Sequence, residues 1–274
     1  MRNILSLALL AIFCLCVMQT SAQTTDTTRY NHYAYMKVKP GMYDDYLKLE
    51  KAWKKIHAAN KKAGKLHDWS LAEMVSPSGA NNEYDFVCRN AYRGIEALSA
   101  SFEGSFMPEN WKSLLSAEEI ALVNRTEEIR TLVKTEIWST EQASVLWAAD
   151  ADTKAKIFVF NYFTLPEGKS ADNHTQMEMD IWRPVHAARM KDGHLKGWLV
   201  LNMEMPLPYP ESAPYQCATV DAYADLKQLL APTGGNYVKK IHPNKTQAEV
   251  WKQTADAATL VKADVRMMVD RLAW

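Results

Sequence analysis

The sequence is poor in cysteine and has no excess of either charge, and both absences restrict its function. The 274 residues include four cysteines, too few for a disulfide framework to replace a hydrophobic core. Lysine plus arginine and aspartate plus glutamate number 32 each, which gives a formal net charge of zero. Binding to nucleic acid or to an anionic membrane surface relies on a basic excess. We therefore expect no nucleic-acid partner and no electrostatic attachment to a membrane.

The sequence also lacks the motifs of the common enzyme and metal-binding families. Its seven histidines are scattered, without the His-x3-His, His-Glu-x-x-His or Cys-x-x-Cys spacing typical of metal sites. Glycine-rich phosphate and dinucleotide loops are missing, and so is the Gly-x-Ser-x-Gly turn of hydrolases. We therefore predict no metal site and no hydrolase, kinase or Rossmann-type activity.

The one long apolar run stands at the N-terminus. Arg2 precedes an almost unbroken apolar stretch at 4–17, and small residues follow as far as Ala22. This order is typical of a secretory signal peptide, so we predict that residues 1–22 are removed. A membrane anchor is the alternative, but the stretch is short of the roughly 20 residues that span a bilayer. We expect an exported protein, periplasmic or secreted, with no membrane span after cleavage.

A repeat runs through the rest of the chain. Residues recur in order at a spacing of 129, as Trp53, His57, Gly64 and Trp69 in the first half and Trp182, His186, Gly193 and Trp198 in the second. The segments 131–137 and 259–265 match at a spacing of 128. A repeat of this kind means that one structural unit is present more than once. We place the two copies at residues 30–140 and 155–270.

Each repeat predicts the same order of elements. A strand rich in aromatic and β-branched residues comes first and stops at a turn with proline and glycine. A helix follows, across 42–63 or 172–191, and ends at a glycine. Two strands, further helical sequence and a last strand complete the unit. These strands begin near Trp69, Tyr84 and Glu128 in the first repeat and near Trp198, Tyr215 and Ala257 in the second. The order β-α-β-β-α-β is that of the ferredoxin-like unit.

A ferredoxin-like sheet carries helices on one face only, and a tandem copy can cover the other face. In this arrangement the chain resembles the dimeric α/β-barrel superfamily in its fused, two-repeat form. The resemblance extends over the whole chain after the signal peptide. It implies an α+β fold in which two tandem ferredoxin-like repeats pack as an intramolecular pseudo-dimeric α/β barrel. We expect the two sheets to face each other about a pseudo-twofold axis.

The resemblance also indicates where a site would lie. The superfamily includes antibiotic-biosynthesis monooxygenases and haem-binding groups such as chlorite dismutases, and its ligands commonly occupy the cleft between helix and sheet. This implies binding of a small apolar or aromatic molecule, with cofactor-independent oxidation or a related acid/base reaction. No cofactor is predicted, and haem rests on fold kinship alone. The rival interpretation is a non-enzymatic envelope scaffold or partner module, and a homo-oligomer remains open.

A Trp-x3-His pair on the first helix of each repeat supplies the candidate catalytic residues. Trp53 with His57, and Trp182 with His186, are four residues apart and share one helix face. His186 and His57 are therefore candidate acid/base groups that look into the cleft, or candidate haem ligands. The alternative is structural, with the tryptophan filling the core and the histidine capping it through a hydrogen bond.

The second repeat carries a polar series on this helix that the first repeat lacks. It comprises His174, Glu178, Trp182, His186 and Arg189. If one cleft is functional, we expect it to be the cleft of the second repeat. The ligand-binding candidates there are His174, Glu178, Trp182 and Arg189. In the first repeat the ligand-binding candidate is Trp53. Trp182 and His186 should lie deepest, and Pro184 should kink the helix. An amphipathic helix with an ordinary polar edge would show the same pattern.

The last strand of each repeat has a charged face. Alternation places Lys134 with Glu136, and Lys262 with Asp264, on one side of the strand. This face lies either in the barrel interior or in solvent. Ion-paired strand faces are ordinarily solvated or structural.

Signal cleavage would leave Cys88 and Cys217 in a compartment that permits disulfides. They could form one bridge or remain two buried thiols that behave as small hydrophobic residues. Cys88 lies four residues after Tyr84, whereas Cys217 lies two after Tyr215, so the positions are not equivalent in the repeats. We expect their Cα atoms to be farther apart than the about 7 Å that a bridge allows, and both thiols to stay free.

Overall fold

The computed structural model describes residues 26–79, 81–104, 106–206, 214–232 and 236–272. The predicted signal peptide, residues 1–22, lies outside these ranges, so its removal stays a prediction. Within them, no helix is long and apolar enough to cross a membrane.

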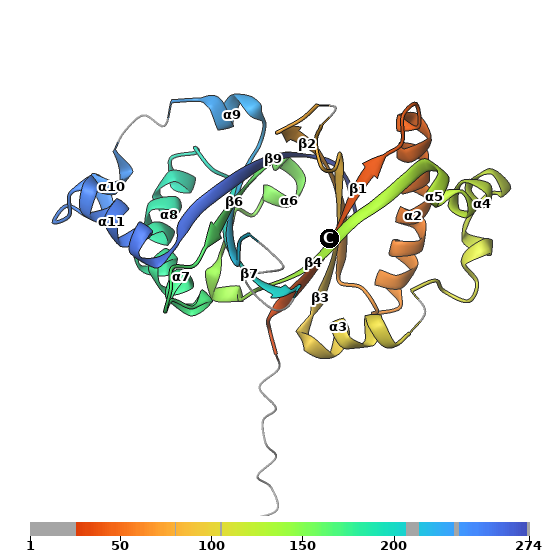
Figure 1. The fold of residues 1–274 in the computed structure, drawn as a ribbon, viewed down its shortest axis with the longest axis horizontal. Helices are drawn as coiled ribbons and strands as arrows, with labels where there is room; N and C mark the ends of the chain where they lie inside the picture. Colours follow the sequence, from red (N-terminus) through yellow and green to blue (C-terminus); the bar gives the residue numbers. More distant parts are fainter. Residues whose placement is uncertain (1–25, 80, 105, 207–213, 233–235, 273–274) are drawn as a thin grey trace, which may run out of the picture.

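The first repeat folds into four long strands and the helices between them (Figure 1). Its strands are β1 (Arg29–Val38), β2 (Asp68–Ser76), β3 (Phe86–Arg93) and β4 (Arg130–Thr140). Its helices are α2 (Tyr43–Lys62), α3 (Gly94–Glu103), the 3-10 turn Trp111–Leu114, α4 (Ala117–Asn124) and α5 (Thr126–Ile129). Gly64 follows α2 with a φ of 74°, in the left-handed region that glycine enters without a steric penalty. The first helix therefore ends where the sequence predicts.

The second repeat follows the same order. Its strands are β6 (Ile157–Thr164), β7 (Gly197–Met205), β8 (Cys217–Tyr223) and β9 (Thr259–Arg271). Its helices are α7 (Ala171–Met177), the π-helical segment Glu178–Trp182, α8 (Arg183–Lys191), α9 (Leu226–Leu230), α10 (Tyr237–Ile241) and α11 (Gln247–Ala257). The linker between the repeats forms the 3-10 turn Gln142–Ser144, β5 (Val145–Trp147) and α6 (Ala151–Lys154).

The two sheets join at both edges and close into a barrel. The first repeat contributes the order β4-β1-β3-β2 and the second the order β9-β6-β8-β7. β2 pairs antiparallel with β9, and β4 pairs antiparallel with β7. Edge strands carry unpaired N–H and C=O groups, and closure satisfies them. The predicted fold class is confirmed, and edge pairing adds to the facing sheets that the sequence led us to expect.

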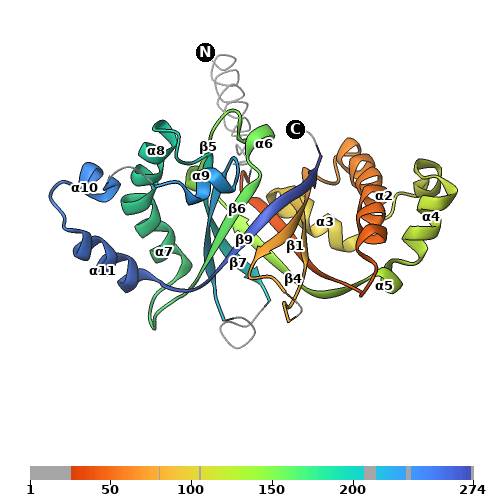
Figure 2. The ribbon, with the colours of Figure 1, turned by 90° about the horizontal axis from the view of Figure 1, so that it is seen from above.

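The side chains of each strand alternate between the barrel lumen and the helices. Helices α2, α4 and α5 lie on one side of the strands, and α7, α8, α10 and α11 on the other (Figures 1 and 2). Trp69 and Trp198 are fully buried on the helix side of their strands, whereas Tyr35 and Tyr162 are buried in the lumen. The lumen therefore forms a core of its own, shared by both repeats.

Pro184 lies where the regular α-helical winding of the first helix of the second repeat is interrupted, whereas the sequence predicts a kink. It is the second residue of α8, directly after the π-helical segment. Proline has no N–H to donate, and its ring clashes with the carbonyl four residues earlier. A π turn holds an extra residue and occurs mostly at such irregularities. The break is therefore a change in helical winding rather than a simple kink.

Candidate functional site

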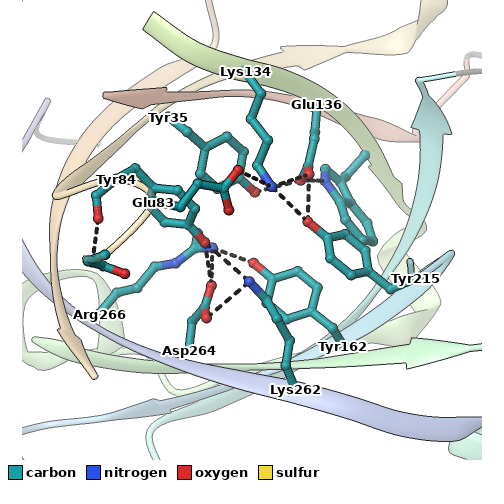
Figure 3. Close-up of polar contacts among 12 residues, drawn as sticks. Tyr35, Glu83, Tyr84, Lys134, Glu136, Tyr162, Tyr215, Lys262, Asp264 and Arg266 are labelled. Atoms are coloured by element: carbon teal, nitrogen blue, oxygen red, sulfur yellow. Dashed lines mark hydrogen bonds and ion pairs between the residues drawn. The ribbon is translucent and has the colours of Figure 1, made fainter. Parts of the chain in front are cut away.

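A layer of polar side chains crosses the lumen (Figure 3). At its first-repeat end, the buried carboxylate of Glu136 on β4 accepts three hydrogen bonds. The donors are the hydroxyls of Tyr35, at 2.6 Å, and Tyr215, at 2.7 Å, and the indole of Trp138, at 3.0 Å. Lys134 Nζ lies 3.4 Å from the same carboxylate.

The second repeat repeats this arrangement. Asp264 on β9 accepts from the hydroxyl of Tyr84 at 2.8 Å and from Nη2 of Arg266 at 3.3 Å. Lys262 Nζ lies 3.3 Å from it. Tyr84 belongs to the first repeat and Tyr215 to the second, so each carboxylate is bound by a tyrosine of the other half.

The phenols of this layer stay protonated at neutral pH. Burial, followed by the charge of Glu136, raises the pKa of Tyr215 well above its ordinary value. Burial likewise raises the pKa of Tyr84. Burial also opposes ionisation of Asp264, but Arg266 and Lys262 hold its pKa below the usual range. The layer thus combines neutral phenol donors with cationic donors around two carboxylates, which stabilises a fixed geometry.

A cavity of about 250 Å³ occupies the lumen on one side of this layer. Each of the eight barrel strands contributes to its wall, together with β5 and α6. Its apolar wall includes Val87, Phe158, Phe160, Leu199, Leu201 and Val220. Asn31, Asp68, Ser70 and Arg89 form a polar wall, and Arg266 connects the cavity to the polar layer. This mixture of apolar wall and few polar groups is typical of small-molecule pockets.

The polar wall is organised around Arg89. Its guanidinium forms an ion pair with Asp68 and donates to Asn31 at 2.9 Å and to Ser70 at 3.2 Å. Arg29 lies in the same wall, where burial and then the charge of Arg89 lower its pKa. This part of the cavity is therefore rich in positive charge.

The linker between the repeats covers one end of the cavity. Trp147 of β5 stacks on Phe158, with ring centres 6.5 Å apart and planes at 17°. Its indole donates to Asp152 at 2.6 Å. The ring lies so close to Gly197 that a side chain there would collide with it. Trp147 thus packs closely against Phe158 and Gly197 and closes this end of the cavity.

The candidate histidines lie on the helix side of the sheets, outside this cavity. His57 stacks on Trp69 and His186 stacks on Trp198, each with ring centres 5.2 Å apart. Burial lowers the pKa of His57 to about 3 and that of His186 to about 4. Both imidazoles are therefore neutral at pH 7. Trp53 and Trp182 lie beside them, with ring centres 6.3 and 6.1 Å away.

The second repeat surrounds its histidine with charge. Arg189 Nη1 lies 3.1 Å from His186 Nδ1, and since arginine can only donate, Nδ1 accepts and Nε2 carries the proton. Arg189 also donates to the hydroxyl of Tyr223 at 3.1 Å, and Asp221 lies 3.6 Å from His186. The equivalent positions in the first repeat hold Asn60 and Asn90. An open groove beside this cluster is lined in part by Trp182, Val185 and Arg189.

The other residues of the predicted polar series do not lie together at one site. His174 is fully buried, and Nε2 lies 3.5 Å from the carboxylate of Glu178, whose pKa burial raises. Trp182 instead donates to Thr254 at 2.9 Å and is only half-buried. The expected depth order is wrong, because His174 and Glu178 lie deeper than Trp182. The π-helical segment between them rotates the stripe that ideal α-helical spacing would keep on one face.

Sequence reasoning missed Tyr35, Tyr162, Arg89 and Arg266 as site residues. It identified the charged strand faces but did not decide whether they face the lumen or the solvent. In the structure they face the lumen. The signal available was the repeat itself. Trp138 and Arg266 are 128 residues apart, so Arg266 stands where the first repeat has an aromatic residue.

The cavity does not fit a metal or haem. In the described ranges, no group of three histidine, cysteine, aspartate or glutamate side chains could hold a metal ion. The residues that line the cavity include neither histidine nor cysteine. His57 and His186 are each stacked on a tryptophan, and Nδ1 of His186 is occupied by Arg189. Neither ring therefore presents an axial ligand to the cavity.

No family model and no curated protein matches the sequence. A candidate monooxygenase from Fusobacterium nucleatum has a similar structure, with a TM-score of 0.52 and 10% identity over 89% of this chain and 94% of that chain. One from Lactobacillus acidophilus has a TM-score of 0.50 and 11% identity over the same shares. The chain has the dimeric α/β-barrel fold in its fused form. At these identities the likeness shows the fold alone.

A haem-binding protein from Thermus thermophilus is a more distant structural neighbour. Its TM-score is 0.43, with 11% identity over 90% of this chain and 95% of that chain. This likeness is too remote to support an inference about the ligand of the fused barrel described above.

Proposed function

We propose that the fused barrel binds a small, largely apolar molecule inside its lumen. The observation that carries this proposal is the cavity of about 250 Å³ to which every barrel strand contributes. A space of this size would hold about eight water molecules at about 30 Å³ each. It is comparable with the smaller ligand pockets of proteins and suits a one- or two-ring aromatic compound.

The walls of the cavity support a binding role. The apolar wall would bury the body of the ligand, while the polar layer at one end and Trp147 at the other limit its length. Most polar groups that face the cavity are already fixed by partners, such as Arg89 by Asp68, Asn31 and Ser70. Fixed side chains lose little freedom on binding, which favours affinity.

Filling the cavity tests the proposal. Ala72 lines it, so Ala72→Phe should occupy much of the space and abolish binding of 2-naphthoate and 2-naphthamide, measured by calorimetry. Ala100 is exposed on α3, and Ala100→Phe is the matched control that should leave binding unchanged. Failure of both probes to bind the unmodified protein, or binding that survives Ala72→Phe, would contradict the proposal.

A second candidate function is acid/base chemistry or cofactor-independent oxidation at the helix–sheet cleft of the second repeat. The observation that favours it is the cluster of His186, Arg189 and Asp221, because the positions of Arg189 and Asp221 are occupied by Asn60 and Asn90 in the first repeat. The adjacent groove at Trp182 and Val185 would admit a ligand. Paired histidine substitutions, described in the Discussion, separate this function from a structural role.

A further inference from the structure

We infer that the molecule bound in the lumen carries a carboxylate, and that Arg266 binds this group. The inference rests on the proposed function, because it identifies the chemical class of ligand for the same cavity. It depends on how Arg266 is placed, on its counterpart in the first repeat and on the charges along the wall.

Arg266 lies in the lumen with hydrogen-bonding capacity left over. The residue is 1% exposed, and the guanidinium carbon lies 3.8 Å from the centre of the Phe160 ring. Its hydrogen bonds, to Tyr162 and Asp264, both use Nη2. Within the described part of the chain, the buried Nε has no hydrogen-bond partner. A guanidinium has five N–H donors, so the donors of Nε and Nη1 remain for charge-assisted hydrogen bonds to a carboxylate.

Asp264 does not neutralise this arginine by itself. The same carboxylate also lies 3.3 Å from Lys262 and accepts from Tyr84. One negative charge is therefore shared between two cations. An anion that enters the cavity would be attracted to the side of Arg266 that faces away from Asp264.

The first repeat shows what this position looks like with an aromatic side chain in place of the arginine. Trp138, the counterpart of Arg266, donates to Glu136 at 3.0 Å and stacks on Tyr215 with ring centres 5.9 Å apart. An aromatic side chain thus satisfies the carboxylate and fills the lumen without bringing in charge. Arg266 breaks the pseudo-symmetry at the residue that borders the cavity.

The net charge of the cavity lining is positive, like that of Arg266. Four arginines border the cavity, Arg29, Arg89, Arg266 and Arg271, against two carboxylates, Asp68 and Asp152. Asp68 is already engaged by Arg89, and Asp152 accepts from Trp147. The surplus is positive, in a site where few waters would screen it. A ligand whose aromatic or aliphatic part packs against Phe158 and Leu201, and whose carboxylate binds Arg266, would contact both the apolar and the polar wall.

Two probes of equal shape test the inference. At pH 7, 2-naphthoate carries a negative charge and 2-naphthamide does not. We expect the unmodified protein to bind the carboxylate about tenfold or more tightly, as a charge-assisted hydrogen bond would produce. Arg266→Met should remove this preference and leave the affinity for the amide unchanged. Arg266→Lys should retain part of it.

Lys262→Met is the matched control. It removes a cation beside the same Asp264, but Lys262 is not part of the cavity wall. The preference for the carboxylate should become smaller, because Asp264 then pairs with Arg266 alone, but it should not be lost as in Arg266→Met. Binding of neither probe would overturn the proposed function itself. Equal binding of both probes, or an unchanged preference in Arg266→Met, would overturn this inference and leave the proposed function standing. If Arg266→Met does not fold, the comparison of the two probes on the unmodified protein still decides.

Discussion

Tyr215 of the second repeat donates a hydrogen bond of 2.7 Å to Glu136 of the first, and Tyr84 of the first donates one of 2.8 Å to Asp264 of the second. The two bonds cross the lumen in opposite senses and tie the repeats together. They join buried groups that water does not reach, so their loss is not compensated by solvent.

We expect Tyr215→Phe and Tyr84→Phe each to lower the free energy of unfolding by about 1–3 kcal/mol, the range for a buried acceptor that loses its donor. Urea denaturation followed by circular dichroism measures this. Tyr43 is 45% exposed and donates to Glu73, so Tyr43→Phe is the control and should change stability by less than about 0.5 kcal/mol. A large effect from Tyr43→Phe and none from the lumen variants would contradict the structural role of the polar layer.

The buried histidines predict a loss of stability in mild acid. Folded His57 and His186 have pKa values of about 3 and about 4, because burial disfavours their charged forms. In the unfolded chain they take up protons below the ordinary value of about 6.5. Between about pH 6.5 and pH 4 the unfolded state therefore binds more protons, and stability falls as the pH falls. For His186 the shift corresponds to roughly 3 kcal/mol.

Denaturation curves at a series of pH values check this expectation. His57→Gln and His186→Gln should each flatten the dependence between about pH 6.5 and pH 4, since each removes one titrating group. A pH dependence that is the same in His57→Gln, His186→Gln and the unmodified protein would show that the two imidazoles are not buried in neutral form.

Alanine substitutions test the acid/base candidate. If the second cleft is functional, His186→Ala should abolish ligand binding or turnover with little change in melting temperature, and His57→Ala should affect function much less. If instead both variants lose a similar ~1–3 kcal/mol of stability and neither alters a ligand, the two histidines have a structural role. The stacking of both rings on tryptophans at 5.2 Å makes the comparison well matched.

The cysteines should be unreactive until the protein unfolds. Cys88 and Cys217 are free and buried, which confirms the expectation of two thiols. Burial raises the pKa of Cys217 to about 12 and that of Cys88 further, so neither forms a thiolate at neutral pH. A thiol reagent should find none in the native mature protein and two in denaturant. Rapid reaction of the native protein would contradict this.

The export signal remains a prediction from the sequence. Intact-mass measurement of the protein from the cell envelope should give a chain that begins at or next to Gln23, because the small residues up to Ala22 form a cleavage site. A mass that corresponds to all 274 residues would show that the segment is retained as an anchor.

Much of the fold could be predicted because the repeat allows the two halves of the sequence to be aligned with each other. The spacing from Trp53 to Trp182 aligned two β-α-β-β-α-β units, and each helix and strand could then be read twice. The pairing of β2 with β9 could not be predicted in this way. Leu71 and Asp270 meet across it, and no local pattern relates two residues so far apart in sequence.

The site was harder to predict than the fold. Alternation shows that Lys134 and Glu136 share one face of a strand, but it does not show what lies opposite. Only the closed barrel makes that face a lumen. The Trp-x3-His motif drew attention to the helix side, whereas Arg266 carries no motif and differs from its surroundings only by comparison with Trp138. In this chain the strand position at which the two repeats differ, Trp138 against Arg266, is therefore the signal that indicates the proposed site.

The crossed tyrosine bonds have a consequence for how the molecule folds. A separated first half would keep Glu136, but this carboxylate would lose one of its three donors. The lumen face of the half would also be exposed to water. Neither copy has a complete interior without the other. The duplicated sequence therefore encodes a single cooperative unit, which should lose its structure in one transition and tolerate no cut that lets the halves part.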